Sequence, residues 1–148
     1  MKRESCRAIV FTDDKLVVMY REKHDRVYYT FPGGGLEENE TLETCVKREC
    51  LEEFGIEVEP IKEAYIYEDE KTKQHFFLVK WIGGEMGSGV GEEFQPETNR
   101  GIYVPTLMPV NKMEQLPLMP PEVVRAMAQD IKEYGYDLAP QTKWVEGK

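Results

Sequence analysis

The chain has few of the features on which several classes of protein depend. No apolar run approaches the roughly 20 residues needed to cross a bilayer, and the start, Met1 to Phe11, lacks the apolar core and cleavage site of a signal peptide. Cys6, Cys45 and Cys50 form no C-x-x-C pair. We therefore expect a cytoplasmic protein without a membrane partner, with all three thiols reduced rather than in a disulfide framework or a zinc knuckle.

Basic residues and histidines are also scarce. Lys and Arg number 19 against 28 Asp and Glu, which makes the net charge −9. Because proteins bind nucleic acid by neutralising phosphates with lysine and arginine, we expect no stable nucleic-acid partner. His24 and His75 have no serine or cysteine at a recognisable spacing, which disfavours nucleophile–histidine catalysis. The length suits a single domain, residues 1–148.

One segment, residues 34–56, is rich in glutamate, with the sequence GGLEENETLETCVKRECLEEFGI. Glu49, Glu52 and Glu53 are three and four residues apart, so a helix places them on one face. Oxygen ligands without interleaved histidine or cysteine select Mg²⁺ or Mn²⁺ over zinc. The segment therefore predicts a divalent-metal site, although a solvated acidic helix is the alternative for an arbitrary glutamate-rich sequence.

Arg48 and the preceding glycines complete this candidate site. Arg48 lies four residues before Glu52 and can turn back toward Glu40, so we expect it to hold carboxylates by charge-assisted hydrogen bonds. The run Gly33 to Gly35 permits close backbone approach. Its carbonyls, including that of Gly34, can join a metal shell, and its amides can face phosphate oxygens.

The spacing G-x5-E-x7-R-E-x-x-E-E-x-G, from Gly34 to Gly55, resembles the signature of the Nudix hydrolases. Cys50 stands where this family usually has a larger aliphatic residue. The resemblance implies a pyrophosphohydrolase in which water, assisted by Mg²⁺ or Mn²⁺, attacks a phosphorus of a nucleoside diphosphate derivative. Glu52 and Glu53 are then the strongest candidate ligands, with Glu49 as a third ligand or the general base.

Outside the signature, Glu92 and Glu93 lie in a loop where related enzymes often place another metal-binding or proton-accepting glutamate, although a solvated loop is an equal alternative. Arg7 and Arg21 lie on early strands that border the cleft in this fold, where they meet substrate phosphates or form surface ion pairs. The full candidate set is catalytic Arg48, Glu49, Glu52 and Glu53; metal-binding Glu49, Glu52, Glu53 and Gly34; substrate-binding Arg7, Arg21, Gly33 and Gly34; and the further candidates Glu40, Glu92 and Glu93.

The pattern of apolar residues and turn residues predicts an α/β (α+β) protein, an alpha/beta/alpha sandwich around a mixed β-sheet, as the resemblance also implies. We expect the tail from about residue 137 to be loosely ordered. The helices are expected at Thr41–Phe54, with Thr41 as N-cap and Gly55 past the end, at one turn within Val110–Leu116, and from Pro121 to Gly135. The strands are expected at Ser5–Phe11, Lys15–Arg21, Arg26–Phe31, Ile56–Tyr67, Lys73–Ile82 and Gly101–Pro105.

The substrate is less closely defined. Lys71 and Lys73 stand where ADP-ribose hydrolases and diadenosine polyphosphate hydrolases of this family carry a proline and a tyrosine. The chain therefore looks more like a MutT-type nucleoside triphosphate pyrophosphohydrolase, with oxidised dNTPs as one candidate substrate and an ADP-ribose or dinucleotide pyrophosphatase as the alternative. A non-catalytic nucleotide-sensing or partner-binding module is a second class, which the complete glutamate set disfavours. Either a monomer or a homodimer is compatible with the sequence.

Overall fold

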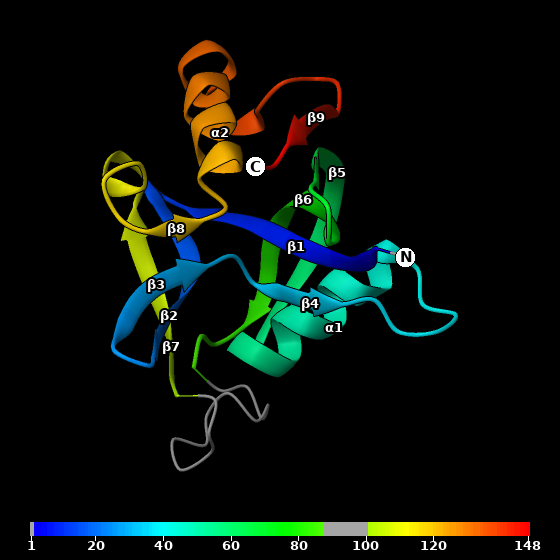
Figure 1. Ribbon diagram of the computed structural model, residues 1–148, viewed down its shortest axis with the longest axis vertical. Coiled ribbons are helices and arrows are strands. Elements are labelled where there is room, and N and C mark those ends of the chain that lie inside the picture. Colours follow the sequence, from blue (N-terminus) through cyan, green and yellow to red (C-terminus); the bar gives the residue numbers. More distant parts are fainter. Residues whose placement is uncertain (1, 88–100) are drawn as a thin grey trace.

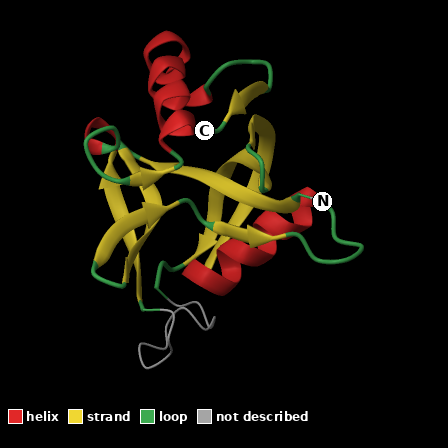
Figure 2. Ribbon diagram, viewed as in Figure 1, coloured by secondary structure: helices red, strands yellow, loops and turns green. Residues whose placement is uncertain are grey.

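The computed structural model describes residues 2–87 and 101–148. Two helices and a mixed β-sheet make up most of this part of the chain (Figure 2). Glu92 and Glu93 lie outside the described residues. The helices are α1 (Leu42–Phe54) and α2 (Pro121–Tyr134), and the strands are β1 (Arg3–Thr12), β2 (Lys15–Lys23), β3 (Arg26–Thr30), β4 (Gly33–Gly35), β5 (Ile56–Glu68), β6 (Thr72–Gly84), β7 (Ile102–Pro109), β8 (Leu118–Met119) and β9 (Lys143–Glu146).

Most of these elements lie where the sequence predicts them. Helix α1 begins after Thr41, whose side chain accepts a hydrogen bond from the backbone N–H of Thr44 at 3.1 Å. It ends at Gly55, whose φ of 75° is the left-handed conformation that glycine adopts without strain. Strand β7 is longer than expected because it stays paired with β2 as far as Pro109, opposite Lys15.

The order of strands in the sheet is β8-β3-β2-β1-β6-β5-β9, with β4 also paired to β1 and β7 to β2. Strand β1 runs parallel to β6 but pairs with β2 only near its end, at Phe11 and Thr12. At its other end β1 pairs with the glycine strand β4, where Cys6 faces Gly34 and Arg7 faces Gly33. Strands β2, β3 and β7 therefore diverge from β1, β5 and β6, and β4 lies beside β1 next to the divergence (Figure 1).

The two helices pack on opposite faces of β1. Successive side chains of a strand point to opposite faces, and Cys6, Ala8 and Val10 lie in the apolar cluster of α1, whereas Ile9 lies in the cluster of α2. This arrangement confirms the expected mixed sheet with two helices. It also brings α1 against β4, so that the glutamate-rich helix faces the glycine strand.

The expectation of a loosely ordered tail is wrong. Residues 143–146 form β9, which pairs in parallel with β5, and Leu138 and Ala139 are buried. Lys143 donates from Nζ to the carboxylate of Asp130, which is fully buried on α2. A buried carboxylate requires such a cation or hydrogen-bond donor, and nothing in the local sequence shows that the tail supplies it.

The expectation that all three cysteines are reduced is also wrong. Cys6 of β1 and Cys45 of α1 form a disulfide, with their Cα atoms 6.2 Å apart and a separation of 39 positions in sequence. The packing of α1 on β1 brings the two sulfur atoms together, which their spacing does not reveal. Cys50 is a free, buried thiol, as expected. Within residues 2–87 and 101–148, neither helix has the length and apolar character required of a membrane span.

Candidate active site

The glycine strand is shaped by contacts that leave no room for side chains. A Cβ atom on Gly33 would lie 2.0 Å from the carbonyl oxygen of Cys6, and its φ of 149° lies in a region that other residues rarely adopt. A Cβ atom on Gly34 would lie 2.7 Å from Oε1 of Glu49. Glycine therefore allows the backbone at residue 34 to lie directly against a carboxylate of α1.

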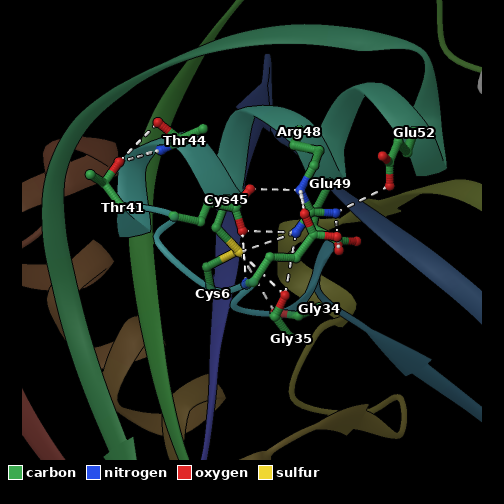
Figure 3. Close-up of polar contacts among 11 residues, drawn as sticks. Cys6, Gly34, Gly35, Thr41, Thr44, Cys45, Arg48, Glu49 and Glu52 are labelled. Atoms are coloured by element: carbon green, nitrogen blue, oxygen red, sulfur yellow. Dashed lines mark hydrogen bonds and ion pairs between the residues drawn. A yellow bond between two sulfur atoms is a disulfide. The ribbon is translucent and has the colours of Figure 1, made fainter.

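Arg48 is the hydrogen-bonding centre of the site (Figure 3). Its Nε and Nη2 donate to the two carboxylate oxygens of Glu40 at 2.6 and 3.0 Å, a two-point ion pair. Its Nη1 donates to Glu49 at 2.9 Å and to Glu52 at 3.2 Å, and Nη2 also donates to the carbonyl of Gly35 at 3.3 Å. These contacts confirm that Arg48 turns back to Glu40 and also reaches Glu52.

The ionisation of this cluster follows from its contacts. Hydrogen bonding from Arg48 is the main reason that the pKa of Glu40 is lowered, and Glu40 in turn raises the pKa of the guanidinium. The pKa of Glu49 is raised, because burial of its carboxyl outweighs the opposing effect of Arg48. Burial therefore disfavours the ionised form of Glu49.

Glu53 joins α1 to the glycine strand through a backbone contact that does not involve Arg48. Its Oε1 accepts a hydrogen bond from the backbone N–H of Gly33 at 2.8 Å. The glutamates of α1 thus have different partners, since Arg48 holds Glu49 and Glu52 while Gly33 holds Glu53. The contacts of Glu53 with Gly33 and of Arg48 with Gly35 join α1 to β4.

The donor set is suited to a hard divalent cation. It consists of carboxylate oxygens next to the backbone of Gly34 and Gly35. Burial raises the pKa of Glu49, and a nearby cation would favour its ionised form. In the described part of the chain, no three His, Cys, Asp or Glu side chains are grouped so as to hold a metal ion. Instead, Glu49 and Glu52 both accept hydrogen bonds from Arg48, and Glu53 accepts one from the backbone of Gly33.

Arg7 lies on β1, where it is paired with Gly33 of the glycine strand. It donates to Phe31 O at 3.0 Å and to the side-chain oxygen of Gln74 at 3.2 Å. Burial lowers the pKa of Arg7, and the carboxylates of Glu53 and Glu49 act in the opposite direction. These side chains adjoin a small pocket of about 140 Å³ lined by Arg7, Thr30, Phe31, Gln74, Met119 and Pro120.

Arg21 is held by aromatic residues of the neighbouring strands. Its guanidinium lies over the rings of Tyr103 and Tyr28, 4.1 and 5.3 Å from their centroids, and Nη2 donates to the Tyr103 hydroxyl. Both tyrosines face Arg21 directly in the strand register. Gln74 is therefore a partner of Arg7, and Tyr28 and Tyr103 are partners of Arg21, and no local sequence pattern indicates these contacts.

The sequence is similar to a known domain family and to proteins of known activity. The model of the NUDIX domain matches residues 1–130. The chain is 40% identical over 74 residues to an 8-oxo-dGTP diphosphatase of Buchnera aphidicola, covering 47% of this chain and 60% of that protein. It is 24% identical over 124 residues to an RNA pyrophosphohydrolase of Pasteurella multocida, covering 71% and 63%. The matched regions thus span less than two thirds of both curated relatives.

The fold also matches solved structures. A crystal structure of an ADP-ribose pyrophosphatase from Streptococcus suis superposes with a TM-score of 0.68 at 18% identity, covering 97% of this chain and 99% of the other. At that identity the likeness shows a shared fold and not a shared substrate. The fold and the family match both agree with the Nudix resemblance of the glutamate segment, residues 34–56.

Proposed function

Because the chain belongs to the NUDIX domain family, we propose that it is a metal-dependent pyrophosphohydrolase acting on a nucleotide. The observation that carries the proposal is the glutamate cluster of α1, which Arg48 and the backbone of Gly33 hold against the glycine strand. A solvated acidic helix needs no such partners. Members of this family generally use divalent metal ions.

We assign the metal, Mg²⁺ or Mn²⁺, to Glu49, Glu52 and Glu53, with the backbone carbonyl of Gly34 as a further ligand. When bound, such an ion offsets negative charge on the phosphates and lowers the pKa of bound water. Hydrogen bonds to Glu40 and to the carbonyl of Gly35 orient the guanidinium of Arg48. The guanidinium in turn positions the carboxylates of Glu49 and Glu52. Glu49 has the raised pKa expected of a proton acceptor, which supports its alternative role as the general base.

Substrate contacts are assigned to the arginines and to the glycine strand. Arg7 and Arg21 are cations on the strands next to β4 and the divergent part of the sheet, where anionic phosphates have to be neutralised. Gly33 and Gly34 offer the close backbone approach that phosphate binding requires. These side chains and backbone groups bind and orient the substrate.

We propose a nucleoside triphosphate as the substrate, cleaved to the monophosphate and pyrophosphate. The similarity to an 8-oxo-dGTP diphosphatase over the signature half of the chain supports this class and keeps oxidised dNTPs among the candidates. An ADP-ribose or dinucleotide pyrophosphatase is the alternative. A purely nucleotide-sensing module is disfavoured, because sensing does not require the complete set of four hydrogen-bonded glutamates.

A screen of nucleotides tests this proposal. Canonical and oxidised nucleoside triphosphates, ADP-ribose and dinucleotides are incubated with the protein and Mg²⁺, and the products, including nucleoside monophosphates, pyrophosphate and ribose 5-phosphate, are separated by chromatography and quantified. We expect turnover of a triphosphate that EDTA abolishes and added Mg²⁺ restores. Turnover unaffected by EDTA would exclude the metal-dependent mechanism, and a preference for ADP-ribose would replace the substrate class.

The bond that is cleaved is tested by hydrolysis in oxygen-18 water. Attack on the β phosphorus places the label in pyrophosphate, and attack on the α phosphorus places it in the nucleoside monophosphate. We expect label in pyrophosphate. Turnover of none of these compounds by the folded, Mg²⁺-supplied protein would favour the sensing module.

A further inference from the structure

Cys6 and Cys45 join the two elements that build the candidate site. Cys6 lies on β1 opposite Gly34 of the glycine strand, and Cys45 lies in the first half of α1. Their Cα separation of 6.2 Å falls within the roughly 4.4–6.8 Å usual for a disulfide. The covalent bond therefore links the glutamate helix to β1, next to the strand that holds Glu53.

The sulfur of Cys45 also contacts the glycine strand itself. It lies 3.8 Å from the carbonyl oxygens of both Gly34 and Gly35 and 3.9 Å from Nη2 of Arg48 (Figure 3). A thiol at this position donates a weak hydrogen bond to one of the carbonyls. A disulfide sulfur has no hydrogen to donate, so oxidation removes that donor from the backbone of the candidate site.

We propose that Cys6 and Cys45 form a redox-responsive clamp between β1 and α1, whose oxidation state changes the hydrogen bonding and stability of the glycine strand. Oxidation by hydrogen peroxide is balanced: the two thiols lose two protons and two electrons, the S–S bond forms, and the O–O bond breaks to give two waters. A dithiol reductant reverses the step and is itself oxidised to a disulfide. Only the consequence for catalysis rests on the proposed function.

Cys50 is a matched internal control. It lies on the same helix, is buried like Cys45, and has no cysteine partner. Cys50 is thus expected to stay a thiol under conditions that oxidise the other two cysteines.

The state of the sulfurs is measured first. The full chain is treated with hydrogen peroxide or with dithiothreitol, the reagent is removed, and free thiols are alkylated in denaturant and counted by mass spectrometry. We expect one alkylated cysteine, Cys50, after oxidation and three after reduction, with a Cys6–Cys45 linked peptide in the oxidised digest. Absence of that linked peptide from folded, oxidised protein would overturn the proposal.

The clamp is then measured by thermal unfolding. Closing a loop of about 40 residues predicts that reduction lowers the Tm of the wild type by roughly 10 °C. Cys6→Ala and Cys45→Ala should each abolish this redox-dependent difference, and Cys50→Ala should keep it. If oxidised and reduced Cys6→Ala differ in Tm as much as the wild type does, the clamp is overturned. If one variant fails to fold, the other variant and the wild-type thiol count still test the clamp.

The effect on the glycine strand is measured by amide hydrogen exchange of the metal-free protein over residues 33–36. We expect exchange to differ between the oxidised and reduced wild type and to be independent of redox state in Cys45→Ala. Equal exchange in both states, with the disulfide formed, would overturn the link to the glycine strand. A redox-dependent Tm and exchange rate in a protein that hydrolyses no nucleotide would retain the clamp and reject the proposed function.

Discussion

Arg48 and Glu40 are eight residues apart and form a two-point ion pair, with Nε–Oε2 and Nη2–Oε1 distances of 2.6 and 3.0 Å. Glu40 lies in the loop after β4, whereas Arg48 lies in the middle of α1. The side chain of Glu40 is 8% exposed and that of Arg48 is 21% exposed, so the pair is partly shielded from solvent. It ties the loop to the helix and orients the guanidinium toward the glutamates of the candidate site.

We predict that Arg48→Lys reduces kcat by roughly 10- to 100-fold, the usual cost of losing a residue that orients metal ligands. A lysine carries the charge but cannot bind both oxygens of Glu40 while also contacting Glu49. Steady-state kinetics and Tm are compared with those of Lys47→Arg, a swap at an exposed neighbouring position. Wild-type kcat in Arg48→Lys would show that charge alone is sufficient.

We predict that Glu53→Gln keeps the fold and lowers kcat by roughly 100-fold or more, which exceeds the usual loss for an outer-shell partner. The glutamine side-chain oxygen still accepts the hydrogen bond of Gly33 N–H, so the backbone contact is retained. The lost charge weakens the proposed metal site. Glu43→Gln, in the exposed first turn of the same helix, is the control. Near-normal turnover of Glu53→Gln at limiting Mg²⁺ would exclude Glu53 as a ligand.

The lowered pKa of Glu40 and the raised pKa of Glu49 predict opposite pH dependences. Glu40 contributes stability above its ordinary pKa of 4.5, and this contribution is lost as pH falls through the lowered folded-state value. Glu49 contributes stability below its ordinary pKa of 4.5, and this contribution is lost as pH rises through the raised folded-state value.

Metal-free Glu40→Gln should therefore be less stable than wild type at neutral pH, with a difference that shrinks in acid. Metal-free Glu49→Gln should be more stable than wild type at neutral pH, with a difference that also shrinks in acid. Tm values between about pH 3 and pH 7 check both signs. Changes of the same sign in the two variants at neutral pH would contradict the assignment.

We predict that Lys143→Met strongly destabilises the protein, by about 3–5 kcal/mol, because it leaves the buried carboxylate of Asp130 without its cation. Asp130 would retain the hydrogen bond from the hydroxyl of Tyr65. Denaturant unfolding measures the effect. The double variant Lys143→Met/Asp130→Asn should recover part of the stability, and Lys132→Met, on the exposed surface of α2, should change it little. A small effect of Lys143→Met would show that the Lys143–Asp130 ion pair adds little to stability.

Features of this protein that depend on residues close together in the chain can be predicted from the sequence. The positions of Glu49, Glu52 and Glu53 on one helical face, the Thr41 cap and the Gly55 terminus follow from helix geometry and local backbone preferences. So do the alternating strands and the return of Arg48 to Glu40. The spacing of the glutamate segment was enough to indicate the family that the comparison then showed.

Contacts between residues far apart in the chain depend on how the helices and strands pack, and local sequence patterns do not predict them. The Cys6–Cys45 disulfide, the hydrogen bond from Arg7 to Gln74 and the pairing of β9 with β5 each depend on which surfaces pack together. Local preferences do not encode that choice, because a short segment such as residues 143–146 becomes a strand only when a sheet edge and a buried Asp130 are available to it. The sequence thus indicates that residues such as Arg7 are candidates for a role, and the fold determines which residues they contact.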